Sequence, residues 1–109
     1  MDGVDTAELN AALERAVERL RRLPESRLRR GAAAEGRALA DELTRRAQLL
    51  ERPCGGGTRR VPDVGLWAVG DQITVTGHDL ARAIEESTDE ERARRELSEA
   101  LAVLAAFRV

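Results

Sequence analysis

Hydrophobic residues recur at helical spacing along most of the chain. Over 5–23, leucine, alanine and valine return every third or fourth position, while glutamate and arginine fill the remaining positions. This spacing is typical of an amphipathic helix that buries one stripe. The segments 24–52 and 89–107 follow the same rule, and Pro24 stands where a first helical turn tolerates its missing N–H. The pattern therefore predicts helices over these three ranges.

The segment 62–87 fits two interpretations. Its valine, isoleucine and threonine residues around Gly70-Asp71 favour a β-hairpin over about 64–76. Wound as a helix, the same segment collects Leu66, Val69, Gly70, Ile73, Gly77, Leu80 and Ile84 on one stripe. Three glycines cost this helix roughly 3 kcal/mol in propensity. Burying several large side chains at ~1.5–3 kcal/mol each can offset that cost. We therefore predict a helix, with the hairpin as the alternative.

Four helices in one chain of 109 residues predict a single all-α domain over 1–109, an antiparallel (up-down) four-helix bundle. The hairpin alternative gives an α+β fold in which two helical pairs flank the strands. A glycine-rich loop over 53–61 is the one clear flexible connection. No apolar run is long enough to span a bilayer, no secretory signal is visible, and Cys54 has no second cysteine for a disulfide. We expect a cytoplasmic protein without a membrane partner.

Charge is concentrated in two segments. Six arginines stand against Glu25 over 19–30, and seven acidic residues stand against three arginines over 85–99. In an up-down bundle the first and third connections share one end, so these two segments are expected to attract each other there. The candidate basic patch consists of Arg21, Arg22, Arg27, Arg29 and Arg30. It makes a nucleic-acid-associated regulator one alternative, although the net charge of −2 weighs against nucleic acid as a partner.

The helical interpretation also places polar side chains on one flank of 62–87. Trp67, Asp71, Thr74 and His78 share this flank, and Asp79 follows the only histidine. An imidazole beside a carboxylate can act as a general base, so a small-molecule or metal-dependent enzyme using Asp71, His78 and Asp79 is a second alternative. A zinc site needs further converging ligands, and we predict no metal and no cofactor. The ordinary interpretation is a solvated helix flank.

Two further residues have an ordinary and a functional interpretation. Trp67 is expected to serve in the core, although tryptophan is also enriched at the centres of protein interfaces. Cys54 is expected to be an unreactive thiol, despite the arginines that follow it. Because no catalytic set is visible, the sequence favours a non-catalytic helical module that binds another protein or a second copy of itself.

Overall fold

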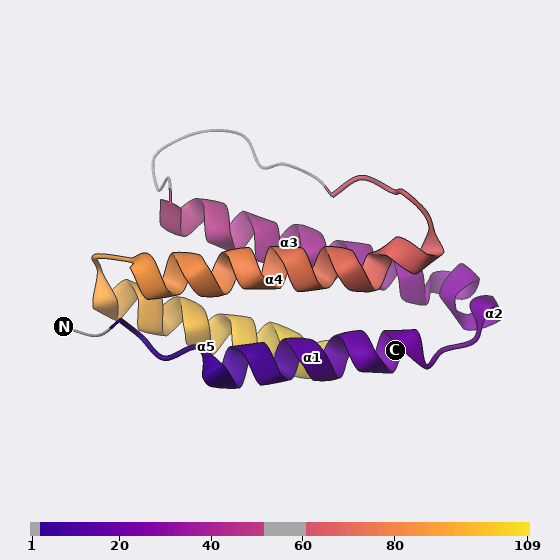
Figure 1. Cartoon of the computed structure of the whole chain (residues 1–109), viewed down its shortest axis with the longest axis horizontal. Helices are drawn as coiled ribbons and strands as arrows, with labels where there is room; N and C mark the ends of the chain where they lie inside the picture. The colour runs from indigo at the N-terminus through magenta and orange to yellow at the C-terminus, as the bar shows by residue number, and fades with distance from the viewer. Residues whose placement is uncertain (1–2, 52–60) are drawn as a thin grey trace.

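The computed structural model describes residues 3–51 and 61–109, and most of them are helical. The helices are α1 (Ala7–Arg21), α2 (Glu25–Arg27), α3 (Ala33–Glu51), α4 (Val69–Glu86) and α5 (Glu90–Ala106), with a π-helical turn at Leu28–Ala32 and a 3-10 turn at Leu66–Ala68. The four long helices pack side by side as a bundle (Figure 1). The described residues contain no strand, so the all-α prediction is confirmed and the hairpin over 64–76 is wrong.

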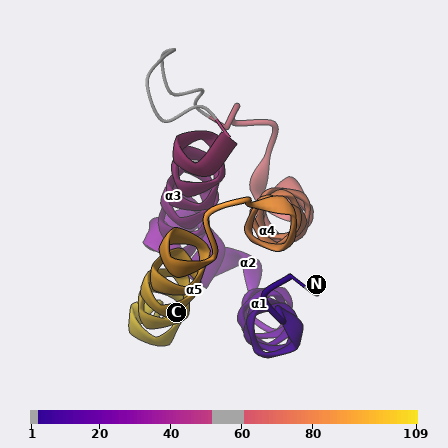
Figure 2. The same ribbon diagram turned by 90° about the vertical axis from the view of Figure 1, so that its left-hand side faces the viewer.

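The helices do not alternate in direction as the up-down prediction required. Gly36 near the start of α3 lies against Val69 at the start of α4, so these two helices run parallel. Arg92 near the start of α5 donates to the carbonyl of Leu49 at the end of α3, at 3.0 Å, so α5 runs opposite to α3. The order is therefore up, down, down, up. Viewed from its end, the bundle has α4 between α3 and α1, with α5 on the other side (Figure 2).

The length of the connection between α3 and α4 makes this order possible. Fourteen residues separate Glu51 from Leu66. A chain of that length reaches up to about 46 Å, whereas the 18 residues of α4 rise about 27 Å. The chain can therefore return to the end of the bundle where α3 began. Of the predicted loop 53–61, only Val61 belongs to the described residues, and Cys54 lies outside them.

The core is built almost entirely from aliphatic side chains of α1, α3 and α4. The largest fully buried side chains are Leu9, Leu43, Val69, Ile73, Leu80 and Ile84. Two glycines, Gly36 and Gly77, let the helices approach closely. A Cβ on Gly36 would collide with Val69, and a Cβ on Gly77 would lie 2.5 Å from Leu13 Cδ2. The absence of these side chains lets leucine and valine fill the space between the helices.

Two predicted helix boundaries need correction. The helix expected over 24–52 is interrupted at Gly31, whose φ of 149° is non-helical and costs little only for glycine. Residues 62–65 are not helical either, because Gly65 adopts a φ of 112° and its N–H is held by the Asp63 carboxylate at 3.1 Å. The Gln72 amide donates to the Pro62 carbonyl at 2.7 Å. The segment before α4 is thus folded back on the helix instead of extending it.

α5 is attached through small side chains and one ion-pair cluster. Its buried residues are Ala93, Ala100 and Leu104. Arg46 of α3 lies 2.8 Å from Glu96 and 3.1 Å from Glu99 of α5, and its side chain is only 13% exposed. Burial opposes the charged form of Arg46, but hydrogen bonds to Glu96 and Glu99 raise its pKa overall. The cluster therefore stabilises the contact between α3 and α5 as a permanently charged group.

Candidate functional site

The predicted polar patch divides between a groove and open surface. Asp71, Thr74 and His78 of α4 line a groove whose other wall is α1, with Glu14 and Glu18 among its residues. Asp79 is exposed and does not line this groove. The structure therefore brings Asp71 and His78 to one groove and leaves the third residue of the suggested enzyme site outside it.

Each polar group in this groove already has a local structural role or faces solvent. Asp71 accepts a hydrogen bond from Arg21 at 3.0 Å, with both side chains well exposed. The Thr74 hydroxyl donates to the Gly70 carbonyl one turn earlier at 3.0 Å. His78 is exposed. Among the described residues, no three His, Cys, Asp or Glu side chains converge to hold a metal ion. The groove is a solvated surface lined by both signs of charge.

The exposed face of α4 carries large hydrophobic side chains. Trp67 is 68% exposed, Val75 is 60% exposed, and Val64 just before the helix is 65% exposed. The core position expected for Trp67 is therefore wrong: it lies exposed in the 3-10 turn that precedes α4. At 100° per residue, Trp67 and Val75 lie about 80° apart around the helix, two turns along. We call Val64, Trp67 and Val75 the α4 ridge.

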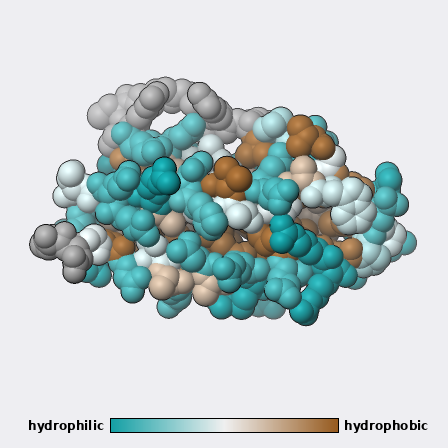
Figure 3. Space-filling model, viewed as in Figure 1, coloured by the Kyte–Doolittle hydropathy of each residue, from teal (hydrophilic) through white to brown (hydrophobic). Residues whose placement is uncertain are grey.

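The surface around α4 is otherwise hydrophilic. In Figure 3, separate hydrophobic patches lie along the middle of this face, over α4, with hydrophilic side chains around them. Leu49 on α3 is the remaining large hydrophobic residue that is more than a third exposed in the described ranges. None of the helices in these ranges combines the length and the hydropathy needed to cross a membrane.

Most of the candidate basic patch is neutralised by nearby carboxylates. Arg21 pairs with Asp71 at 3.0 Å, Arg22 with Glu18 at 2.7 Å and Arg29 with Glu25 at 3.4 Å. Arg27 and Arg30 are exposed and form no ion pair with a described residue. These five arginines thus leave two free charges for a phosphate or another anion.

The expected attraction between 19–30 and 85–99 is also wrong. Arg21 at the end of α1 meets Asp71 near the start of α4, while Thr6 at the start of α1 donates to the Glu85 carboxylate at the end of α4. The basic and acidic segments therefore begin at opposite ends of the bundle, because α3 and α4 run in the same direction. The molecule has one basic and one acidic end.

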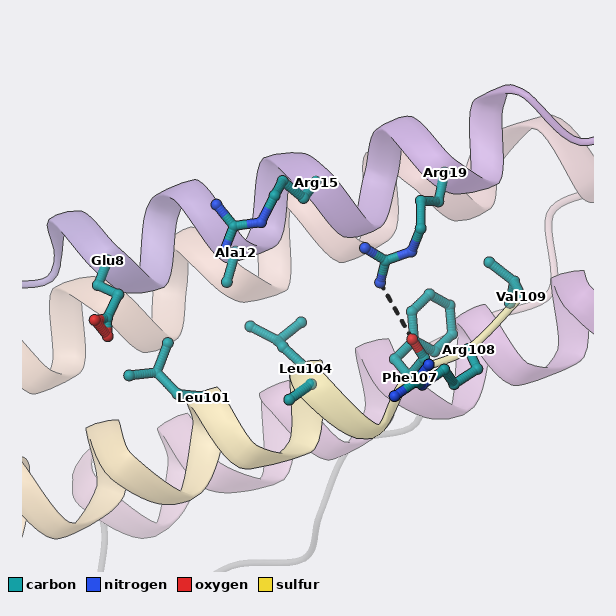
Figure 4. A pocket seen from close by; sticks show the side chains of 10 residues that line it. Glu8, Ala12, Arg15, Arg19, Leu101, Leu104, Phe107, Arg108 and Val109 are labelled. Carbon is teal, nitrogen blue, oxygen red and sulfur yellow. Dashed lines mark hydrogen bonds between the residues drawn. The ribbon is translucent and has the colours of Figure 1, made fainter.

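A second groove lies between α1 and α5 and was not predicted. It has a volume of about 490 Å³, and Ala12, Leu101, Leu104 and Phe107 give it an apolar floor. Figure 4 shows Arg15 and Arg19 extending from α1 toward α5, with Arg108 on the opposite side. We call this the α1–α5 groove.

The arginines of the α1–α5 groove lack carboxylate partners. Arg19 donates to the Phe107 carbonyl at 3.1 Å, and Arg15 and Arg108 make no ion pair or hydrogen bond with a described side chain. Glu8 stands at the far end of the groove. One sequence signal could have found this surface. Glu8, Ala12, Arg15 and Arg19 recur at helical spacing as a second stripe of α1, beside the apolar one.

Comparison with known proteins adds no family and no fold relative. No protein-family model, no curated protein and no solved structure matches this chain.

Proposed function

We propose that this chain is a non-catalytic interaction module that self-associates through the α4 ridge. The observation that carries the proposal is the exposure of Trp67, the only tryptophan, just before a helix that exposes Val75 and buries its opposite face. Tryptophan loses little conformational entropy for the large area it buries and is enriched at interface centres. A cytoplasmic location belongs to the same proposal and depends on the single cysteine and the sequence pattern.

The position of the α4 ridge is compatible with a second copy as the partner. The ridge lies at the start of α4, at the basic end, and the acidic end of α4 lies away from it. If two copies pair their α4 ridges about a two-fold axis, the exposed side chains of each copy cover those of the other. The same surface then serves on both copies, and the assembly closes as a dimer. Only three large hydrophobic side chains are available, so we expect micromolar affinity.

Sedimentation equilibrium over micromolar concentrations tests this dimer. The wild-type chain should approach twice the monomer mass as concentration rises, and 0.5 M salt should not weaken the dimer, because the contact is hydrophobic and salt screens the repulsion between the two basic ends. The fluorescence of Trp67 offers a second readout, since its emission should shift to shorter wavelength as the ring leaves water. A wild-type chain that stays monomeric throughout this range would contradict the proposal.

Matched variants locate the interface. The double variant Trp67→Ser, Val75→Ser removes two exposed side chains, so the fold should persist while the dimer dissociates about tenfold more readily. Leu49→Ser is the control, because Leu49 is also an exposed hydrophobic residue but belongs to α3. A dimer that survives the double variant, or that is lost equally in the control, would place the interface elsewhere.

A further inference from the structure

We infer that the α1–α5 groove binds an acidic amphipathic helix from a partner protein. This surface belongs to a different pair of helices from the α4 ridge, and the inference does not depend on self-association. The groove combines an apolar floor with free arginine side chains along its walls. A helix with one apolar stripe and flanking carboxylates matches both features.

The groove is open because α5 approaches α1 through few large side chains. Leu104 and Phe107 are buried, but Leu101 is only partly buried and Ala105 is exposed. On α1, Ala12 faces the groove and is too small to fill it. Ala12, Leu101 and Ala105 therefore contribute apolar surface that the described residues do not cover. Contact with an apolar stripe would remove this surface from water at a gain of about 25 cal/mol per Å².

The length of the groove suits a short helix. Glu8 and Arg19 mark its two ends on α1 and are eleven residues apart. That separation corresponds to about 17 Å, or three helical turns. α1 and α5 run in the same direction here, because Arg19 near the end of α1 contacts the carbonyl of Phe107 just beyond the end of α5. Two parallel helices with a shallow channel between them accommodate a third helix along the same axis.

The charge of the groove selects acidic partners. Arg15 and Arg108 carry no ion pair, and Arg19 contacts only a backbone carbonyl. Three guanidinium groups at one surface repel one another and gain when carboxylates approach, and each presents a planar fork that can bind a carboxylate at two points. Glu8 supplies an opposing charge at the far end. Glutamates on both sides of the apolar stripe would therefore contact arginines from α1 and from the segment after α5.

A peptide titration tests the inference directly. The probe is a fluorescein-labelled synthetic helix of three to four turns with leucine along one stripe and glutamate elsewhere. Its partner probe has the same leucines and lysine in place of every glutamate. Fluorescence anisotropy with the wild-type chain should give a Kd at least about tenfold lower for the glutamate peptide. Equal affinity for the two peptides, or no binding of the glutamate peptide, would overturn the inference.

Charge variants then place the peptide. Arg15→Glu, Arg108→Glu should weaken binding about tenfold, because attraction becomes repulsion at two points of the groove. Arg27→Glu, Arg30→Glu is the matched control: it makes the same change in net charge with two unpaired arginines at the basic end, outside the groove. The control should change the Kd by about threefold or less. Equal weakening by both variants would show that general attraction, and not the groove, binds the peptide.

A steric variant tests, independently of charge, whether the peptide binds on the floor of the α1–α5 groove. Ala105→Trp places a large side chain on an exposed position that lines the groove, so the fold should persist and the peptide should be excluded. Unchanged affinity in this variant would overturn the inference. Sedimentation of the chain with saturating peptide provides a further check. A dimer that keeps its mass supports separate surfaces, whereas a dimer that the peptide dissociates would make the groove the self-association site and overturn the partner proposed here.

Discussion

α4 and α5 have similar lengths but are held in the bundle in different ways. α4 buries eight of its 18 residues, including Ile73, Leu80 and Ile84, and packs closely against its neighbours where Gly36 meets Val69 and Gly77 meets Leu13. α5 buries three of its 17 residues, two of them alanine. Its firmest contact is the polar cluster around Arg46. The molecule is therefore a close-packed core of α1, α3 and α4 with a more lightly attached fourth helix.

This difference separates the parts that stabilise the fold from the surfaces available for binding. α3 and α4 pack closely where Gly36 meets Val69. The light packing of α5 leaves the α1–α5 groove open, and the outer face of α4 carries the α4 ridge because only its inner face is needed for the core. The side chains that stabilise the fold and those proposed for binding thus lie on different sides of the same helices.

The largest expected effect comes from truncating a leucine in each region. Leu80→Ala on α4 should lower the free energy of unfolding by about 3–4 kcal/mol, because Leu80 is fully buried and leaves a cavity. Leu101→Ala on α5 removes the same atoms from a partly buried position and should cost about 1 kcal/mol. Urea denaturation measures both values. Equal losses would contradict the difference between the two regions.

Removing the polar attachment of α5 should have the next largest effect. Arg46→Met leaves Glu96, whose side chain is 14% exposed, without its partner, and we expect a loss of about 2 kcal/mol. Arg94→Met is the control, because its partner Glu90 lies on the same helix in an exposed pair that contributes about 0–0.5 kcal/mol. Urea denaturation again compares the two. A loss below that of the control would show that the cluster does not hold α5.

Replacing either of two glycines one heptad apart on α4 with alanine should change the free energy of unfolding, but with opposite signs. Gly77→Ala places a Cβ 2.5 Å from a buried leucine methyl group, so its packing cost exceeds the gain in helix propensity by about 1 kcal/mol. At Gly70 the nearest atoms would lie at 3.4 Å, an ordinary contact, and Gly70→Ala should stabilise by about 0.5–1 kcal/mol. Thermal unfolding monitored by circular dichroism distinguishes them. A stable Gly77→Ala variant would mean that the contact between α1 and α4 can widen without cost.

The smallest expected effect is on how the stability of the fold depends on pH. The hydrogen bond from Arg45, together with the charges of Arg45 and Arg46, holds the pKa of the Glu42 carboxyl below its ordinary value of 4.5 despite partial burial. The folded state therefore gains stability from this group above pH 4.5 and loses it as the pH falls through the lowered pKa. Glu42→Gln should show a weaker loss of stability in this acidic range than the wild-type chain. Identical acid titrations of stability would contradict this role for Glu42.

The helices could be predicted from the sequence because a helix with one buried face carries hydrophobic residues at every third or fourth position. The stripe from Val69 to Ile84 identifies α4 whatever its direction, since a buried face looks the same from either end. The direction of α4 depends on the path of the connection after Glu51. A connection of fourteen residues is long enough for α4 to run either parallel or antiparallel to α3. The up-down order and the attraction between 19–30 and 85–99 failed for this one reason.

The candidate surfaces were predicted only in part. The flank with Asp71 and His78 follows from helical spacing, but the exposure of Trp67 depends on how the 3-10 turn before α4 sits outside the packed helices. The α1–α5 groove requires two helices far apart in sequence to lie side by side. Arg15 and Arg108 acquire a common role only through that contact, which no local pattern contains.

Native-state hydrogen exchange of individual amides tests the division between core and attached helix most directly. We expect the amides around Ile73 and Leu80 to exchange only through complete unfolding, and those of Leu97 to Val103 to exchange through a smaller opening that releases α5. The two groups should therefore differ in opening free energy and in dependence on low urea concentrations. If both groups opened with the same free energy and the same urea dependence, α5 would belong to the cooperative core.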